Sequence, residues 1–161
     1  MPATQLIDLR RAWVFESLIE AEVEMVSAVV EYRNCPPETT VVEAGTSDRS
    51  LFVVYSGSVR IVKRETSGEE TAIAEVLPGQ HFGEVAFVDG GVRTATAITN
   101  EPTELLVIDP RRFAKLAESQ PMAGYKIAWS LLRLMCGRLR NTDFWLFELM
   151  DRGAASPAPR R

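Results

Sequence analysis

The first part of the chain places apolar and acidic residues at the spacing of an α-helix. Between residues 6 and 33, glutamates fill positions between apolar residues such as Leu18, Val23, Val26 and Val30. This spacing puts the apolar side chains on one face of a helix. Asn34-Cys35-Pro36-Pro37 ends the pattern, because proline cannot continue a helix and also restricts the residue before it. We therefore predict an N-terminal helical segment over residues 1–37.

From residue 38 to residue 109 the pattern changes to short runs typical of β-strands. β-branched and apolar residues favour strands, and glycine and proline favour the turns between them. The expected strands are residues 39–43, 51–55, 58–64, 94–99 and 104–108. Ser56-Gly57 and Ser67-Gly68 indicate hairpins, and Pro78-Gly79 indicates another tight turn. Many short strands at regular spacing predict a barrel or roll.

Helical spacing returns after residue 109 and continues to residue 150. Asp109 suits an N-cap and Pro110 suits the first helical position. A second helix is expected to begin at Pro121 and to carry a row of residues with a repeat close to 3.5, which we call the seam. The seam consists of Tyr125, Ala128, Leu132, Met135, Leu139, Thr142, Leu146 and Leu149.

The seam has two interpretations: it packs on the barrel of its own chain, or it pairs with a second chain. We favour pairing, and therefore expect a homodimer formed through the C-terminal helix. Residues 110–150 are expected to form the C-terminal helices. Residues 151–161 are small, contain proline and end in arginines, so a disordered tail is expected there.

Composition restricts the class of protein. The chain has 161 residues, 46% of them hydrophobic, which fits one globular domain with a full core. A net charge of −4 disfavours binding to DNA or to an anionic membrane. Cys35, Cys136 and the lone His81 do not have metal-ligand spacing, and no signal peptide or membrane-spanning run is present in the sequence. We expect a cytoplasmic protein without a metal or cofactor.

Candidate chemistry is concentrated in residues 82–97, which read Phe-Gly-Glu-Val-Ala-Phe-Val-Asp-Gly-Gly-Val-Arg-Thr-Ala-Thr-Ala. Arg93 offers a fork of donors that fits phosphate oxygens, and the turn at Gly83 offers free N–H groups. Glu84 would repel a phosphate, so its natural partner is a neutral hydroxyl of the same ligand. A 3′,5′-cyclic nucleotide carries one charged cyclic phosphate and one free 2′-hydroxyl.

These motifs resemble, in order, the cyclic nucleotide-binding domains of catabolite-activator-type regulators, cyclic-nucleotide-dependent kinases and nucleotide-gated channels. The resemblance runs from about residue 51 to about residue 142, through the 82–97 loop and a late Gly-Arg-Leu-Arg-Asn-Thr. It implies an α+β fold, mainly β: an eight-stranded antiparallel β-roll (jelly-roll-like) with helices at both ends. Residues 151–161 are too few for a helix-turn-helix domain, so we expect a free-standing sensor that does not bind DNA.

The resemblance also implies the role of each candidate residue. Glu84 would accept the ribose 2′-hydroxyl and Arg93 would hold the cyclic phosphate. Backbone groups of Gly83, Val85 and Ala95 would contact ribose or phosphate, beside the small Ala86. The loop has Val92 where the family often has proline, which puts affinity rather than function in question.

For the base, the matched positions are the apolar Ile61 and Ile73. Thr142 and its neighbour Asp143 would meet the adenine amino group, although Thr142 can also be a polar residue that sets the register of the seam. Thr94 matches a position that can reach guanine, or it serves the phosphate. Phe144, Trp145 and Phe147 can alternatively cap the base by stacking. We favour cAMP over cGMP.

Three functions compete. The favoured one is a cyclic nucleotide sensor that signals to an unidentified partner by movement of its C-terminal helix. The alternatives are a protein of the same fold that binds no nucleotide and assembles through the seam, and an enzyme. Because no nucleophile, base and orienting group can be placed together, an enzyme is disfavoured.

Overall fold

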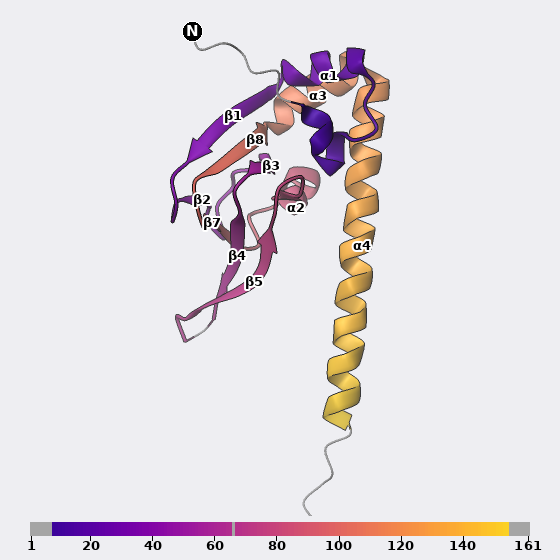
Figure 1. The fold of residues 1–161 in the computed structure, drawn as a ribbon. Coiled ribbons are helices and arrows are strands. Elements are labelled where there is room, and N and C mark those ends of the chain that lie inside the picture. Colours follow the sequence, from indigo (N-terminus) through magenta and orange to yellow (C-terminus); the bar gives the residue numbers. More distant parts are fainter. Residues whose placement is uncertain (1–7, 66, 155–161) are drawn as a thin grey trace, which may run out of the picture.

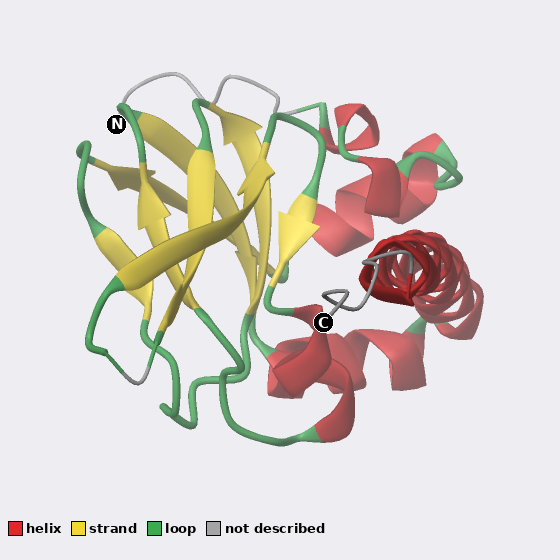
Figure 2. Cartoon of the chain, turned by 90° about the horizontal axis from the view of Figure 1, so that it is seen from below, coloured by secondary structure: helices red, strands yellow, loops and turns green. Residues whose placement is uncertain are grey.

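The computed structural model describes residues 8–65 and 67–154. These residues contain eight strands, which form two four-stranded antiparallel sheets that face each other, with the helices gathered on one side (Figures 1 and 2). One sheet has the order β1-β8-β3-β6 and the other β2-β7-β4-β5. The strands are β1 (Val30–Cys35), β2 (Thr40–Val42), β3 (Leu51–Ser56), β4 (Val59–Arg64), β5 (Glu70–Val76), β6 (His81–Phe82), β7 (Thr96–Thr99) and β8 (Thr103–Ile108). The predicted antiparallel β-roll is confirmed.

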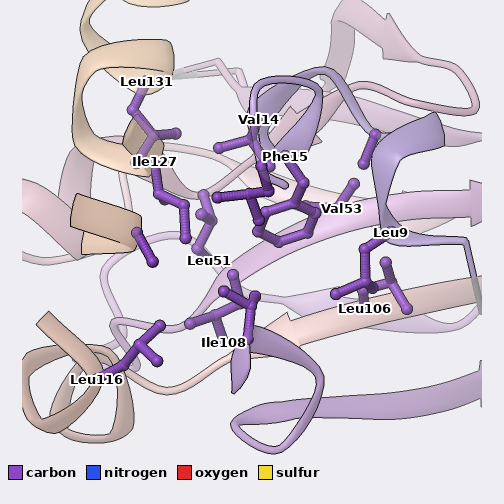
Figure 3. Packing of buried hydrophobic residues seen from close by; sticks show 14 residues of the cluster. Leu9, Val14, Phe15, Leu51, Val53, Leu106, Ile108, Leu116, Ile127 and Leu131 are labelled. Atoms are coloured by element: carbon purple, nitrogen blue, oxygen red, sulfur yellow. The ribbon is translucent and has the colours of Figure 1, made fainter. Parts of the chain in front are cut away.

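Strand β3 is buried on both faces, which explains its unbroken run of apolar residues. Phe52 and Val54 point into the core between the two sheets, where Phe52 stacks on Phe82 at 5.0 Å between ring centroids. Leu51 and Val53 point the other way and pack on the helices (Figure 3). The roll therefore has one core inside it and a second core between its outer face and the helices.

Among the described residues, the helices on that outer face are two 3-10 helices, η1 (Leu9–Arg11) and η2 (Trp13–Phe15), and four α-helices. The α-helices are α1 (Glu20–Ser27), α2 (Glu84–Asp89), α3 (Pro110–Ser119) and α4 (Pro121–Ala154). Phe15 of η2 and Ile127 of α4 are fully buried in this second core (Figure 3). The predicted start of α3 is confirmed, because the Asp109 side chain accepts hydrogen bonds from the backbone N–H groups of Arg111 and Arg112.

The prediction of a helical segment as far as residue 37 was wrong at its end. Helix α1 ends at Ser27, and the following β1 pairs with β8 from Val30 opposite Ile108 to Cys35 opposite Thr103. The spacing of Val26 and Val30 fits a helix, but pairing along six residues satisfies the backbone groups of β1 that face β8. Residues 1–7 of the predicted segment lie outside the described residues.

Helix α4 is about 51 Å long, from its 34 residues and a rise of about 1.5 Å per residue. Its first turns pack on the roll and on α3, and its later half runs past the other helices (Figure 1). The helix continues to Ala154, so the predicted tail was wrong for residues 151–154. The rest of that tail lies outside the described residues. Within the described part of the chain, none of the helices has the length and hydropathy needed to cross a bilayer.

Candidate functional site

A cavity of about 560 Å³ lies between the roll and α4. Its walls come from β4, β5, β6 and α2, from residues 93–97, from Trp13 of η2, and from one face of α4. Nine of the eleven predicted site residues line it: Ile61, Ile73, Gly83, Glu84, Val85, Ala86, Arg93, Thr94 and Ala95. Residues from separate strands and loops thus meet around one space of the size that small-molecule sites have.

Arg93 is 3% exposed and is held at the wall of this cavity. Its Nη1 donates to the Gly83 carbonyl at 2.8 Å, and its Nη2 donates to the Ser50 carbonyl at 2.6 Å and to Asp48 at 3.0 Å. Its Nε has no hydrogen-bond partner among the described residues. A buried cationic donor without a partner is costly, so Arg93 retains capacity to bind an anion.

Asp48 balances part of the charge on Arg93. Burial alone would raise the pKa of Asp48, but hydrogen bonds from Ser50 and Arg93 outweigh that effect and lower the pKa. The carboxylate therefore stays ionised beside the guanidinium. Asp89, which is close to Arg93 in sequence, instead accepts from the backbone N–H of Gly91 at 2.7 Å.

Gly83 shapes the turn between β6 and α2. Its φ of 81° lies in the left-handed region, and an added side chain there would collide with the Arg93 guanidinium. The N–H groups of Glu84, Val85 and Ala86 have no acceptor among the described residues. The turn therefore places three free backbone donors and Arg93 close together at the cavity.

Glu84 is 8% exposed and forms an ion pair with Arg138 of α4, whose Nη1 lies 2.5 Å from Glu84 Oε1. Nη2 of Arg138 donates to the His81 carbonyl at 2.6 Å. Arg138 thus joins α4 to both β6 and α2. Only Oε1 of Glu84 takes part in the pair, and Oε2 has no hydrogen-bond donor among the described residues. This second oxygen can accept from a ligand.

His81 lies beneath α4, on the same strand as the core residue Phe82 but facing the opposite way. It is 2% exposed, and neither ring nitrogen has a hydrogen-bond partner among the described residues. Burial and the nearby charge of Arg138 lower the pKa of His81 to about 4, against the opposing effect of Glu84. The imidazole is therefore neutral at pH 7.

Thr142 and Asp143 do not line the cavity. Thr142 is exposed, and its hydroxyl donates to the Arg138 carbonyl of its own helix at 3.0 Å. The side of α4 that lines the cavity carries Leu134, Gly137, Arg138 and Asn141. Because each residue turns about 100° around an α-helix, Thr142 and Asp143 point away from the side that carries Asn141.

Sequence reasoning missed Arg138, Asn141, His81 and Trp13 as cavity residues. Arg138 and Asn141 stand within the late Gly-Arg-Leu-Arg-Asn-Thr motif, and they fall outside the apolar seam. The signal that could have identified them is a basic side chain and an amide side chain three residues apart on the helix, next to the seam. Trp13 and His81 gave no comparable signal.

Comparison with known proteins gives a consistent result. A family model described as "Cyclic nucleotide-binding domain" matches residues 32–120. The chain is 31% identical over 133 residues to the cyclic AMP receptor protein of Thermus thermophilus, covering 83% of this chain and 60% of that protein. It is 27% identical over 142 residues to a CRP-like cAMP-activated global transcriptional regulator of Mycobacterium tuberculosis, covering 88% and 62%.

Among solved structures, the catabolite activator protein of Thermus thermophilus superposes with a TM-score of 0.77 at 30% identity. That match covers 86% of this chain and 63% of the other. The chain thus spans about 60% of the length of the curated relatives it matches.

Proposed function

The chain belongs to the cyclic nucleotide-binding domain family, and from this we propose that its cavity binds a 3′,5′-cyclic nucleotide, cAMP in preference to cGMP. The observation that carries the proposal is that one cavity holds both a buried arginine with an unused donor and a carboxylate with an unused acceptor, Arg93 and Glu84. These two groups complement one phosphate and one hydroxyl.

In the proposed complex, the cyclic phosphate lies against the Arg93 guanidinium and the free N–H groups that follow Gly83. Thr94 and Ala95 form the other side of the phosphate position, where the Thr94 hydroxyl can donate to a phosphate oxygen. Asp48 stays on the far side of Arg93 and keeps the guanidinium oriented. Charge-assisted contacts of this kind are stronger than neutral hydrogen bonds.

The ribose 2′-hydroxyl then donates to Oε2 of Glu84, while Arg138 retains Oε1. This arrangement makes Arg138 a positioning residue for Glu84, because the ion pair fixes the carboxylate rotamer. It also links the ligand to α4, since Arg138 belongs to that helix. A regulatory module that signals by movement of α4 would use this link.

For the base, we propose an apolar face on Ile61 and Ile73 and a polar edge at Asn141. Trp145 stands one helical turn beyond Asn141 and is exposed. Since helical side chains lean toward the N-terminus of their helix, we propose that the indole covers the bound base. Thr142 and Asp143 would reach a base only from a second copy paired through the seam.

The preference for cAMP rests on the named relatives, two of which are a cyclic AMP receptor protein and a cAMP-activated regulator. One is described as a receptor protein and the other as a transcriptional regulator, and we propose a regulatory rather than a catalytic role here. The exposed apolar seam residues Leu139, Leu146 and Leu149 support pairing with a second copy.

Calorimetry on the purified chain with cAMP, cGMP and 5′-AMP tests this proposal. We expect binding of one cAMP per chain, weaker binding of cGMP, and little binding of 5′-AMP, whose open phosphate carries more charge than the cyclic diester. Tighter binding of cGMP would reverse the assignment of the base. No heat and no thermal shift with either cyclic nucleotide at millimolar concentration would reject nucleotide binding.

Glu84→Gln is expected to weaken cAMP binding by about 1.5–3 kcal/mol, the range for hydrogen bonds to charged groups. The amide can no longer serve as a charged acceptor for the 2′-hydroxyl. Binding of 2′-deoxy-cAMP, which lacks that hydroxyl, should change much less. Calorimetry with both nucleotides on both proteins measures the difference.

Glu75→Gln is the matched control, since Glu75 also lines the cavity but accepts a hydrogen bond from Asn100 at 3.0 Å. It should leave the affinity for cAMP nearly unchanged. Equal weakening of cAMP and 2′-deoxy-cAMP by Glu84→Gln would mean that Glu84 acts through Arg138 alone and not through the ribose.

A further inference from the structure

The cavity extends along α4 in both directions from Arg138. Toward the C-terminus it reaches Asn141, about 4.5 Å further along the helix axis, and toward the N-terminus it reaches Arg133, about 7.5 Å away. The proposed nucleotide occupies the level of Arg138 and the side of Asn141. The opposite side, which we call the inner end, is lined by Trp13, Gln80, His81, Arg133 and Leu134.

A rigid segment presents Trp13 to the inner end. Its neighbours Ala12, Val14 and Phe15 are buried in the core between the roll and the helices (Figure 3). Trp13 itself is 47% exposed, and its backbone N–H donates to the Gly79 carbonyl at 3.0 Å. A side chain at Gly79, whose φ is 87°, would come within 3.3 Å of the indole Nε1, so glycine is needed beside the indole. An exposed aromatic ring held in this way is a preorganised surface for stacking.

The polar groups of the inner end are mainly hydrogen-bond donors. Arg133 forms no ion pair within residues 8–65 and 67–154. Oε1 of Gln80 accepts from the Leu77 N–H at 2.9 Å, which leaves the side-chain NH₂ group to donate. His81 is 2% exposed, and its two ring nitrogens have no partner in the described part of the chain. Because a buried polar group without a partner is costly, a ligand with polar atoms is favoured here.

Charge narrows the class of this ligand. The two carboxylates that line the cavity, Glu75 and Glu84, are already engaged in a hydrogen bond and in an ion pair. Arg133 therefore offers one positive charge to one anionic group. A guanidinium fork fits the two oxygens of a carboxylate, and the Trp13 indole fits a flat ring. An aromatic ring that bears one carboxylate matches both groups.

We propose that the inner end binds an aromatic carboxylate, with its ring stacked on Trp13 and its carboxylate paired with Arg133. This site uses none of the groups assigned to the phosphate, ribose or base, so it does not depend on the proposed nucleotide binding. The cavity then holds two ligands side by side along α4, a nucleotide toward Asn141 and an aromatic acid toward Arg133.

Calorimetry of the full chain with 2-naphthoate, in the absence of nucleotide, tests the site. Arg133→Gln should weaken binding roughly tenfold or more, because it removes the charge that faces the carboxylate. Trp13→Leu should weaken binding roughly three- to tenfold through the loss of stacking, and Trp13→Tyr should keep most of the affinity. 2-Naphthamide, which has the same ring and no charge, should bind the wild type roughly tenfold more weakly than 2-naphthoate.

Arg140→Gln and Trp129→Leu are the matched controls. Both residues are exposed on α4 and lie outside the cavity lining, so these variants should bind 2-naphthoate as the wild type does. Circular dichroism melts of each variant check that any loss of binding is not a loss of fold.

Each result decides a separate point. No heat with millimolar 2-naphthoate, or a folded Arg133→Gln with wild-type affinity, overturns the site. Saturating cAMP should change the affinity for 2-naphthoate by less than about threefold, below the usual range of allosteric coupling. Mutually exclusive binding would put the acid in the nucleotide position and overturn the separate inner end. If cAMP itself does not bind, the proposed function fails, and the titrations without nucleotide still decide the inner end.

Discussion

Arg93→Ala is expected to weaken binding of cAMP by about 2–5 kcal/mol, or roughly 30- to 5,000-fold. Arg93 is the buried cation of the cavity, and in the proposed complex it faces the only charge on the ligand. Its removal would leave the phosphate without a counter-charge and Asp48 without its cationic partner. Calorimetric titration of the wild-type chain and the variant measures this loss.

Arg93→Lys and Arg60→Ala serve as comparisons. Lysine keeps the charge but not the fork, so it should recover only part of the affinity. Arg60 forms an ion pair with Glu38 at the surface, and its loss should leave binding unchanged. Because Arg93 also holds the carbonyls of Gly83 and Ser50, a thermal melt must show that each variant is folded. A folded Arg93→Ala that binds cAMP within threefold of the wild type would contradict the assignment.

The titration of His81 is expected to lower the free energy of unfolding by about 3 kcal/mol between pH 7 and pH 4. Its pKa is 6.5 for an unperturbed histidine and about 4 in the folded chain. The unfolded chain therefore binds the proton first as the pH falls, and the stability is lost from about pH 6.5 down to pH 4. Above pH 6.5 both states are neutral at this position and the loss is absent. The magnitude follows from about 1.36 kcal/mol per pKa unit.

His81→Leu isolates this contribution, because other acidic groups of the chain also titrate in that range. Leucine removes two ring nitrogens that have no partners among the described residues, so at pH 7 the variant should be at least as stable as the wild type. Urea unfolding at pH 7 and pH 4 gives the difference in free energy of unfolding between the two proteins. A difference that does not grow toward low pH would show that His81 titrates normally in the fold.

Local sequence signals were sufficient for most of the roll and for the centre of the site. Ser56-Gly57 and Pro78-Gly79 mark turns in any context, and Gly83, Glu84 and Arg93 stand within eleven residues of one another. Their types alone indicate an anion and a hydroxyl. The structure brings them to one cavity as the pattern predicts.

What escaped prediction depends on distant parts of the chain. Strand β1 is defined by its pairing with β8, more than 60 residues away, whereas the spacing of Val26 and Val30 alone fits a helix. Arg138 forms an ion pair with Glu84, 54 residues away in the sequence, and no local sequence pattern predicts that contact. Thr142 follows Asn141 by a single residue, yet the turn of the helix puts only Asn141 at the cavity.

Because β3 is apolar on both faces, burial alone does not determine its register. A slip of one residue would exchange Leu51 and Val53 with Phe52 and Val54 and would still bury hydrocarbon on each side. Polar contacts at the two ends of the strand distinguish the correct alignment: the Ser50 carbonyl accepts from Arg93, and the Ser56 hydroxyl donates to Glu104 at 2.8 Å. Arg93, which we assign to the ligand, thus also helps to fix the register of β3, because it holds the Ser50 carbonyl beside β3 and the Gly83 carbonyl beside β6.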